Sequence, residues 1–86
     1  MGPARTPGAV LTAYARIVIN SKARQLSRRS GFSRSDEEDL VQELTLRLLE
    51  KEHLYDPARG ATLDTFADRV ITSAVKMILR DRRRLK

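Results

Sequence analysis

The sequence contains no cysteine, no tryptophan and a single histidine, and its only other aromatic residues are two tyrosines and two phenylalanines. Without cysteine, a disulfide-stapled scaffold and a cysteine-ligated zinc site are both excluded, and a reducing compartment is the expected environment. His53 alone cannot form a metal site, so no metal and no cofactor are expected. No apolar run reaches signal-peptide or transmembrane length, so we expect a soluble, cytoplasmic chain.

Groups that build active sites are also scarce. There is no cysteine nucleophile, no Ser/His/Asp set with interpretable spacing and no glycine-rich loop of the kind that cradles phosphate. His53 follows a predicted helix, where a turn or dipole-compensating role is more common than a role as a general base. The sequence therefore favours a binding module over an enzyme, with no small-molecule ligand.

Charge is distributed unevenly along the chain, which has a formal net charge of +6. Residues 1–34 carry seven Lys/Arg and no acid, residues 35–56 carry two against eight acids, and residues 57–86 carry eight against three. A basic protein of this kind favours a polyanionic partner, and nucleic acid is the commonest one inside a cell. Binding to an anionic membrane is the weakest alternative, because the acidic middle segment opposes it.

The chain, at 86 residues, is long enough for one small domain only. Residues 1–8, "MGPARTPG", contain two prolines and two glycines and are expected to be a disordered leader or an artificial remnant of cloning. Residues 9–86 are predicted to form a single all-α domain, a small three-helix bundle without strands.

Apolar spacing places the three helices. The first is expected to end before Gly31 and to bury Val10, Tyr14, Ile17, Val18 and Ser21. The second is expected to begin at a capping box and to run to about Glu52. The box consists of Ser35 and Glu38, and the buried stripe of Leu40, Val41, Leu44 and Leu48, with Phe32 packed before it.

The third helix is expected to start after Thr62 as N-cap and to continue into the final arginines. Its predicted buried stripe consists of Leu63, Phe66, Val70, Ile71, Ala74, Ile78 and Val75. Between the second and third helices, Pro57 and Gly60 predict a turn.

A polar set on the second helix exceeds what helix capping requires. Asp39, Gln42, Glu43 and Arg47 follow the spacing i, i+3, i+4 and i+8 and share one side of the helix. Such a side can dock on a partner protein of complementary charge, and the alternative is a solvated face.

Basic residues form a second set along the third helix. Arg69, Lys76 and Arg80 are spaced along one side, and more arginines follow. Helix-dipole compensation accounts for about two such charges, whereas a full row predicts salt-dependent binding to nucleic acid. The first helix adds another basic surface, for which a solvated face is an equally good interpretation.

The segment "EDLVQELTLRLLE", followed by "YDPARG" and by a helix ending in arginines, resembles region 2 of the sigma-70 family of bacterial RNA polymerase sigma factors. The resemblance extends over residues 36–84 and implies a role in transcription initiation. It implies docking of the second helix on the clamp helices of the largest polymerase subunit through Asp39, Gln42, Glu43 and Arg47. It also implies an anti-sigma factor as a conceivable further partner.

For the third helix, the resemblance implies contact with the promoter minus-ten element. The residues that it assigns to DNA are Arg69, Ser73, Lys76, Arg80, Arg82, Arg83 and Arg84. Family members commonly carry Trp, Asn and Asp where this chain has Phe66, Ser73 and Met77. These departures favour, as an alternative, a polymerase-binding regulator without promoter recognition; a stand-alone basic DNA-binding protein is another.

Overall fold

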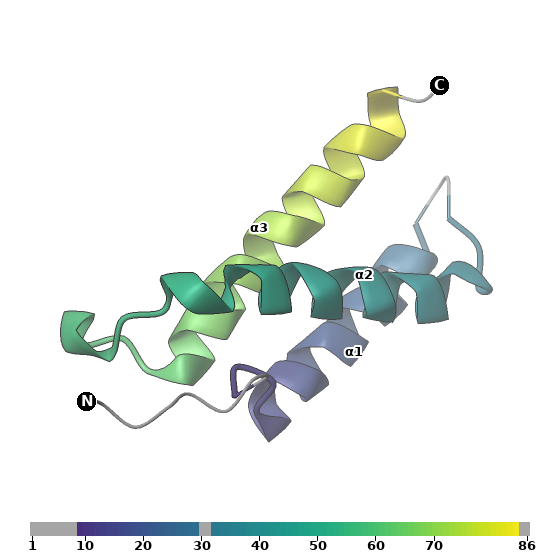
Figure 1. Cartoon of the computed structure of the whole chain (residues 1–86). Helices are drawn as coiled ribbons and strands as arrows, with labels where there is room; N and C mark the ends of the chain where they lie inside the picture. Colours follow the sequence, from purple (N-terminus) through teal and green to yellow (C-terminus); the bar gives the residue numbers. More distant parts are fainter. Residues whose placement is uncertain (1–8, 30–31, 85–86) are drawn as a thin grey trace.

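Three helices enclose one core in the computed structural model, which describes residues 9–29 and 32–84, except for the side chains of residues 82–84. Helix α1 spans Ala13–Ser27, α2 spans Asp36–Lys51, and α3 spans Leu63–Arg84 (Figure 1). Two short 3₁₀ helices, η1 (Glu52–Leu54) and η2 (Pro57–Arg59), connect α2 to α3. The described residues contain no strand, which confirms the predicted all-α bundle. The predicted leader lies outside the described residues.

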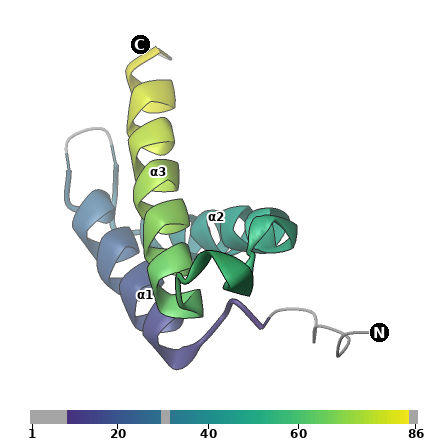
Figure 2. The same cartoon turned by 90° about the vertical axis from the view of Figure 1, so that its left-hand side faces the viewer.

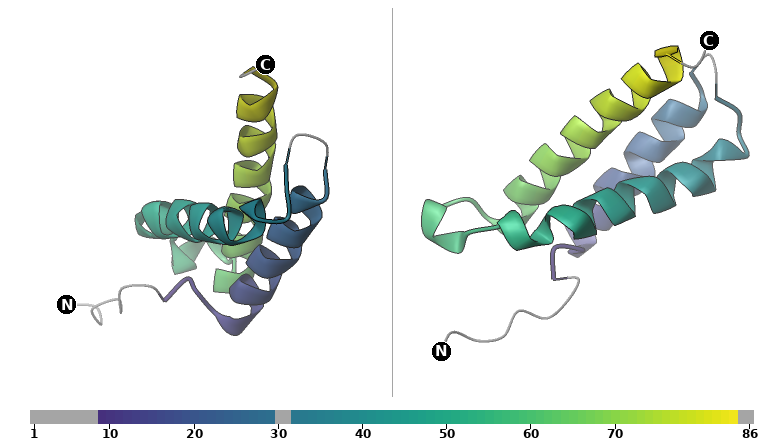
Figure 3. Two further views of the ribbon diagram at one scale, coloured as in Figure 1. Left: turned by 90° about the vertical axis from the view of Figure 1, so that its right-hand side faces the viewer. Right: turned by 45° about the horizontal axis from the view of Figure 1, so that its top comes forward.

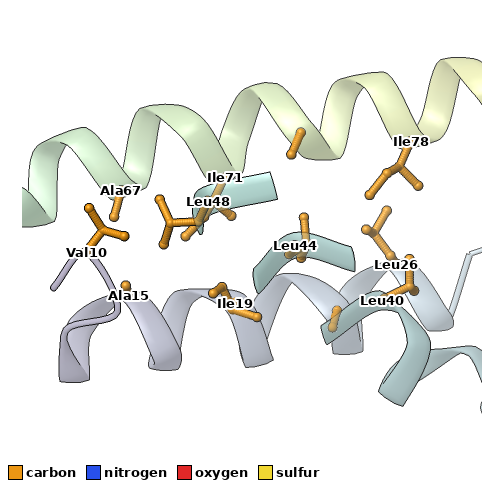
Figure 4. Packing of buried hydrophobic residues seen from close by; sticks show 12 residues of the cluster. Val10, Ala15, Ile19, Leu26, Leu40, Leu44, Leu48, Ala67, Ile71 and Ile78 are labelled. Atoms are coloured by element: carbon orange, nitrogen blue, oxygen red, sulfur yellow. The ribbon is translucent and has the colours of Figure 1, made fainter. Parts of the chain in front are cut away.

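Helices α1 and α3 run side by side in the same direction, and α2 packs across both of them (Figures 1 and 3). At one end of the core, Leu26, Leu40 and Ile78 approach one another from the three helices (Figure 4). Near the other end, Val10 lies beside Ala67. Leu40, Leu44 and Leu48, at the i, i+4, i+8 spacing on α2, therefore pack between α1 and α3.

The expected buried stripe of α1 is wrong. Val10 is buried but lies before the helix, and Val18 is partly buried, whereas Tyr14 and Ile17 are 41% and 67% exposed. Ser21 is exposed as well. The side that α1 buries instead consists of Ala15, Ile19, Ala23, Leu26 and Ser27.

The error follows from the small residues of α1. Thr12 caps the helix by accepting a hydrogen bond from the Ala15 amide at 3.1 Å, so Val10 cannot set the phase of the helical stripe. Alanines at positions 15 and 23 bury little surface individually, but they allow the neighbouring helices to approach closely. The helix ends at Ser27 and thus before Gly31, as expected, and Gly31 itself lies outside the described residues.

The predicted capping box of α2 is also wrong in detail. Ser35 occupies the N-cap position, but its side chain makes no capping hydrogen bond. The Ser33 amide instead donates to Asp36 Oδ2 at 2.7 Å, and the hydroxyl groups of Ser33 and Ser35 lie 2.8 Å apart. Tight turns precede the first α-helical residue. The carboxylate that accepts from a free amide is therefore that of Asp36, on the Ser33 amide, whereas the sequence pattern predicted Glu38 on the Ser35 amide.

The expectations for the remaining helices largely hold. Leu40, Leu44 and Leu48 are buried, and α2 ends at Lys51, one residue before the expected end. Thr62 Oγ1 accepts a hydrogen bond from the Thr65 amide at 3.1 Å, which confirms its capping role at the start of α3. On α3, Ile71, Ala74 and Ile78 are buried, together with Ala67, which the sequence pattern did not include; Leu63, Phe66, Val70 and Val75 are partly buried against the core.

Candidate interaction surfaces

The exposed side of α2 lies opposite its buried leucines. Asp39, Gln42 and Glu43 are all exposed there, as the sequence predicted. Leu46 lies among them, three or four residues after Glu43 and Gln42, and is 59% exposed. We refer to Asp39, Gln42, Glu43 and Leu46 as the α2 face. An apolar side chain surrounded by acidic and amide groups is the composition of a small protein-docking surface.

Arg47 does not share this side fully. Its Nε donates to Glu43 Oε2 at 2.7 Å, and its side chain is less exposed than that of Glu43. Arg47 also lines a groove between α2 and α3. The predicted set of four residues is therefore split, with three residues and Leu46 facing outward and Arg47 at the edge of the groove.

The groove measures about 880 Å³ and is bounded by the end of α2, the η1–η2 loop and α3. Four cationic side chains line it, whereas Asp56 is its single acidic lining residue, and its apolar part includes Leu54, Phe66 and Met77. The four cations are Arg47, Lys51, Arg59 and Arg69. We refer to this cavity as the basic groove.

The η1–η2 loop holds its shape through four local features. Asp56 Oδ1 accepts from the Ala58 amide at 2.9 Å, and Gly60 adopts the left-handed region with φ 85°. Tyr55 donates its hydroxyl proton to the Ala61 carbonyl at 2.9 Å, and its ring packs edge-on against Phe66 with centroids 5.4 Å apart. These contacts fix the wall of the basic groove that carries Arg59.

Arg69, Ser73, Lys76 and Arg80 all lie exposed on one side of α3, as the sequence predicted. Arg69 and Ser73 line the basic groove, and Lys76 lies beside them over a second, shallower hollow. Residues 82–84 continue the helix, but the side chains of Arg82, Arg83 and Arg84 lie outside the described part of the chain. We refer to Arg69, Ser73, Lys76 and Arg80 as the α3 row.

Two acids in the first half of α3, Asp64 and Asp68, bind side chains at the start of α1, and Asp68 also lines the second hollow together with Lys76. Thr12 Oγ1 donates to Asp64 Oδ1 at 2.8 Å, and the Tyr14 hydroxyl donates to Asp68 Oδ2 at 3.2 Å. The hydrogen bond to Asp68, followed by the charge of that carboxylate, raises the pKa of Tyr14 above its ordinary value. Both carboxylates are thus hydrogen-bonded to residues at the start of α1, and that of Asp68 lies beside the cations of the α3 row.

Neither a metal centre nor a membrane span is found in the part of the chain that the structure describes. No three histidine or acidic side chains among residues 9–29 and 32–84 form a group suited to hold a metal ion. The helices described here are too short or too polar to cross a bilayer.

Sequence reasoning did not identify three contributors to these surfaces. Lys51 lies at the end of α2 and Arg59 in the loop that folds back toward α3, and no spacing rule relates either residue to Arg69. Leu46 stood out in the sequence only as an apolar residue beyond the buried stripe, and its exposure makes it part of the α2 face.

Comparison with models of known protein families matches residues 21–85 to the family described as Sigma-70 region 2. The matched segment begins within α1 and includes all of α2, the η1–η2 loop and all of α3. Comparison with curated proteins and with solved structures gives no match.

Proposed function

Because the chain belongs to the sigma-70 region 2 family, which acts in transcription initiation, we propose that its α2 face docks on core RNA polymerase while its α3 row and basic groove contact promoter DNA. The observation that carries this proposal is the separation of the two surfaces on different helices. The acids of α2 would meet protein, and the cations of α3 would meet DNA. Such a mechanism is non-catalytic.

The composition of the α2 face supports a protein partner. Asp39 and Glu43 supply negative charge that attracts and orients a basic surface, here the clamp helices of the largest polymerase subunit. Leu46 supplies apolar area that becomes buried on docking, and Gln42 can donate and accept hydrogen bonds. An exposed leucine inside a charged patch gains its full burial energy only when a partner covers it.

The α3 row supports contact with the minus-ten element. Arg69, Lys76 and Arg80 can each neutralise a backbone phosphate, and Ser73 can reach a base edge or a phosphate. The basic groove adds an apolar surface framed by cations, which suits a nucleotide that has left the duplex. Phosphate contacts would set the position of the DNA, and the groove would accept an unpaired base.

A second candidate function follows from the groove residues. Ser73 and Met77 stand where the family commonly has Asn and Asp, and Met77 contributes an exposed thioether that forms no strong hydrogen bond. At these two positions the groove offers a base edge fewer hydrogen-bonding groups than Asn and Asp would. The alternative is a regulator that binds polymerase through the α2 face without recognising promoter DNA. In a protein that binds DNA without polymerase, the affinity for DNA would instead not change with substitutions in the α2 face.

The test combines the purified chain with core RNA polymerase and then adds promoter DNA. Asp39→Ala together with Glu43→Ala should raise the dissociation constant for polymerase at least tenfold, or about 1.4 kcal/mol. Glu38→Ala, which removes an acid from the same helix outside the α2 face, is the control and should bind normally. Arg69→Ala together with Lys76→Ala should spare polymerase binding and abolish promoter protection.

The outcomes separate the candidate functions. Failure of the unmodified chain to bind polymerase would refute the proposal. Polymerase binding without any promoter footprint would establish the regulator instead. A stand-alone DNA-binding protein would not bind polymerase, and its affinity for DNA would not change with the substitutions in the α2 face.

A further inference from the structure

A second basic site lies at the junction of α1 and α2, away from the basic groove. Arg24 and Arg28 from the end of α1 and Arg34 from the following connection line a recess of about 280 Å³. Ser27 and Glu37 complete its lining. We refer to it as the arginine recess. None of its residues lines the basic groove or belongs to the α3 row.

The charge of the recess is not balanced within the described residues that line it. Three guanidinium groups face one carboxylate, that of Glu37, whose Oε2 lies 3.9 Å from Arg24 Nε. The Arg24 and Glu37 side chains are 64% and 37% exposed, and an ion pair that open to water contributes little. The recess therefore keeps an excess of positive charge that packing and pairing within it leave available to a ligand.

The packing of the core does not use the side chains of Arg24 and Arg28. The side of α1 that packs on the core consists of Ala15, Ile19, Ala23 and Leu26, whereas Arg24 and Arg28 are exposed. Ser27 satisfies its own buried hydroxyl by donating to the Arg24 carbonyl at 2.9 Å. The backbone at the end of α1 is thus closed without help from the guanidinium groups.

The recess lies at the end of the bundle where α1 ends. There the C-terminal end of α1 lies beside the C-terminal half of α3, and Leu26 approaches Ile78 (Figures 2, 3 and 4). Arg80 is exposed on that half of α3, and three more arginines follow in the sequence. The exposed cations described at this end of the bundle include Arg24, Arg28, Arg34 and Arg80, and the acids in the first turn of α2 and Asp81 lie at the same end.

We propose that Arg24, Arg28 and Arg34 bind backbone phosphates of DNA, forming a second contact separate from the α3 row. The identity of the polyanion rests on the function proposed above. A free phosphate compound fits less well, because a site for a small anion encloses its ligand, whereas Arg24 is mostly exposed to solvent. Exposed arginines spaced along a surface suit a chain of phosphates.

The experiment measures the affinity of the complete chain for a fluorescein-labelled promoter duplex by anisotropy over a series of salt concentrations. Arg28→Ala with Arg34→Ala should lower the slope of log affinity against log salt by about 1.8, at about 0.9 per lost phosphate contact. The control, Arg16→Ala with Lys22→Ala, removes the same charge from α1 outside the recess and should change the slope much less. Circular dichroism of each variant checks that the fold is retained.

Two further measurements distinguish failure of this proposal from failure of the proposed function on which it rests. Arg69→Ala with Lys76→Ala should reduce the slope by a similar amount. If that pair weakens binding while the recess pair behaves like its control, the recess proposal is overturned and the proposed function stands. Titration with inorganic tripolyphosphate, followed by thermal stabilisation, tests the other source of phosphate. Arginine-dependent stabilisation by tripolyphosphate in a chain without affinity for DNA would also overturn the proposal.

Discussion

The Nε atom of Arg47 lies 2.7 Å from Oε2 of Glu43, one turn earlier on α2. This pair ties the guanidinium group to an acid of the α2 face, while the Arg47 side chain also lines the basic groove. The carboxylate of Glu43 remains about half exposed and available to a partner. One ion pair thus marks the boundary between the surface proposed for polymerase and the surface proposed for DNA.

Leu46→Ala should weaken polymerase binding without weakening the fold. The side chain is more than half exposed, so its truncation should change the free energy of unfolding by no more than about 0.5 kcal/mol. If Leu46 is buried on docking, the dissociation constant for core polymerase should rise about tenfold or more. Ile17→Ala removes an equally exposed aliphatic side chain from α1 and serves as control. Equal affinities of the two variants would remove Leu46 from the proposed interface.

Ser73→Trp should block the basic groove. Ser73 lines the groove and is exposed, so an indole ring at this position would occupy the space proposed for a nucleotide and leave the core intact. We expect the variant to bind polymerase normally and to lose promoter opening, measured by permanganate reactivity of unpaired thymines. Thr72→Trp introduces the same ring on the neighbouring exposed position outside the groove and should retain opening. Normal opening by Ser73→Trp would argue against the groove as the nucleotide site.

Gly60→Ala should destabilise the loop that forms one wall of the groove. Nothing lies within 4 Å of the position that a Cβ would occupy, so the cost comes from the backbone alone. A left-handed φ of 85° costs an L-residue with a Cβ about 1–2 kcal/mol. Asparagine tolerates this region better, so Gly60→Asn should lose less stability in thermal unfolding. The reverse order would show that the loop does not retain its left-handed residue in solution.

Tyr14 should make stability depend on pH in the alkaline range. Its hydrogen bond to Asp68, and then the charge of that carboxylate, favour the neutral phenol and raise its pKa in the folded state. The resulting stabilisation is complete below the unfolded pKa of about 10 and is lost as pH rises through the folded value. Absorbance of tyrosinate against pH, compared between the unmodified chain and Tyr14→Phe, isolates this titration. Asp68→Asn should shift the pKa back toward its ordinary value.

The sequence was sufficient to predict α2, α3 and the fold class, because their large aliphatic residues recur at helical spacing. It was insufficient for α1, whose buried side depends on Ala15 and Ala23. Alanine is a strong helix former on any side of a helix, and its small side chain gives a weaker apolar signal than a large aliphatic one. Only the positions of α2 and α3 reveal that these two alanines face the core.

The candidate surfaces, like the helices, could be predicted from the sequence only in part. Asp39, Gln42 and Glu43 follow a helical spacing, so their common exposure could be predicted from sequence. The basic groove could not, because the η1–η2 loop brings Arg59 toward α3 through the Tyr55 hydrogen bond and the turn at Gly60. Local spacing predicts which residues share a helix side, whereas a loop conformation decides which separate elements meet.

The contacts at the start of α1 have a practical consequence for anyone who shortens this chain. Thr12 and Tyr14 bind acids 52 and 54 residues further along, and Val10, Ala15 and Ile19 fill one end of the core. A fragment trimmed to the family boundary at residue 21 would lose all five residues and begin in the middle of a helix. Such a fragment would expose Ala67 and Ile71 to water, and its failure to bind a partner would report on truncation rather than on function.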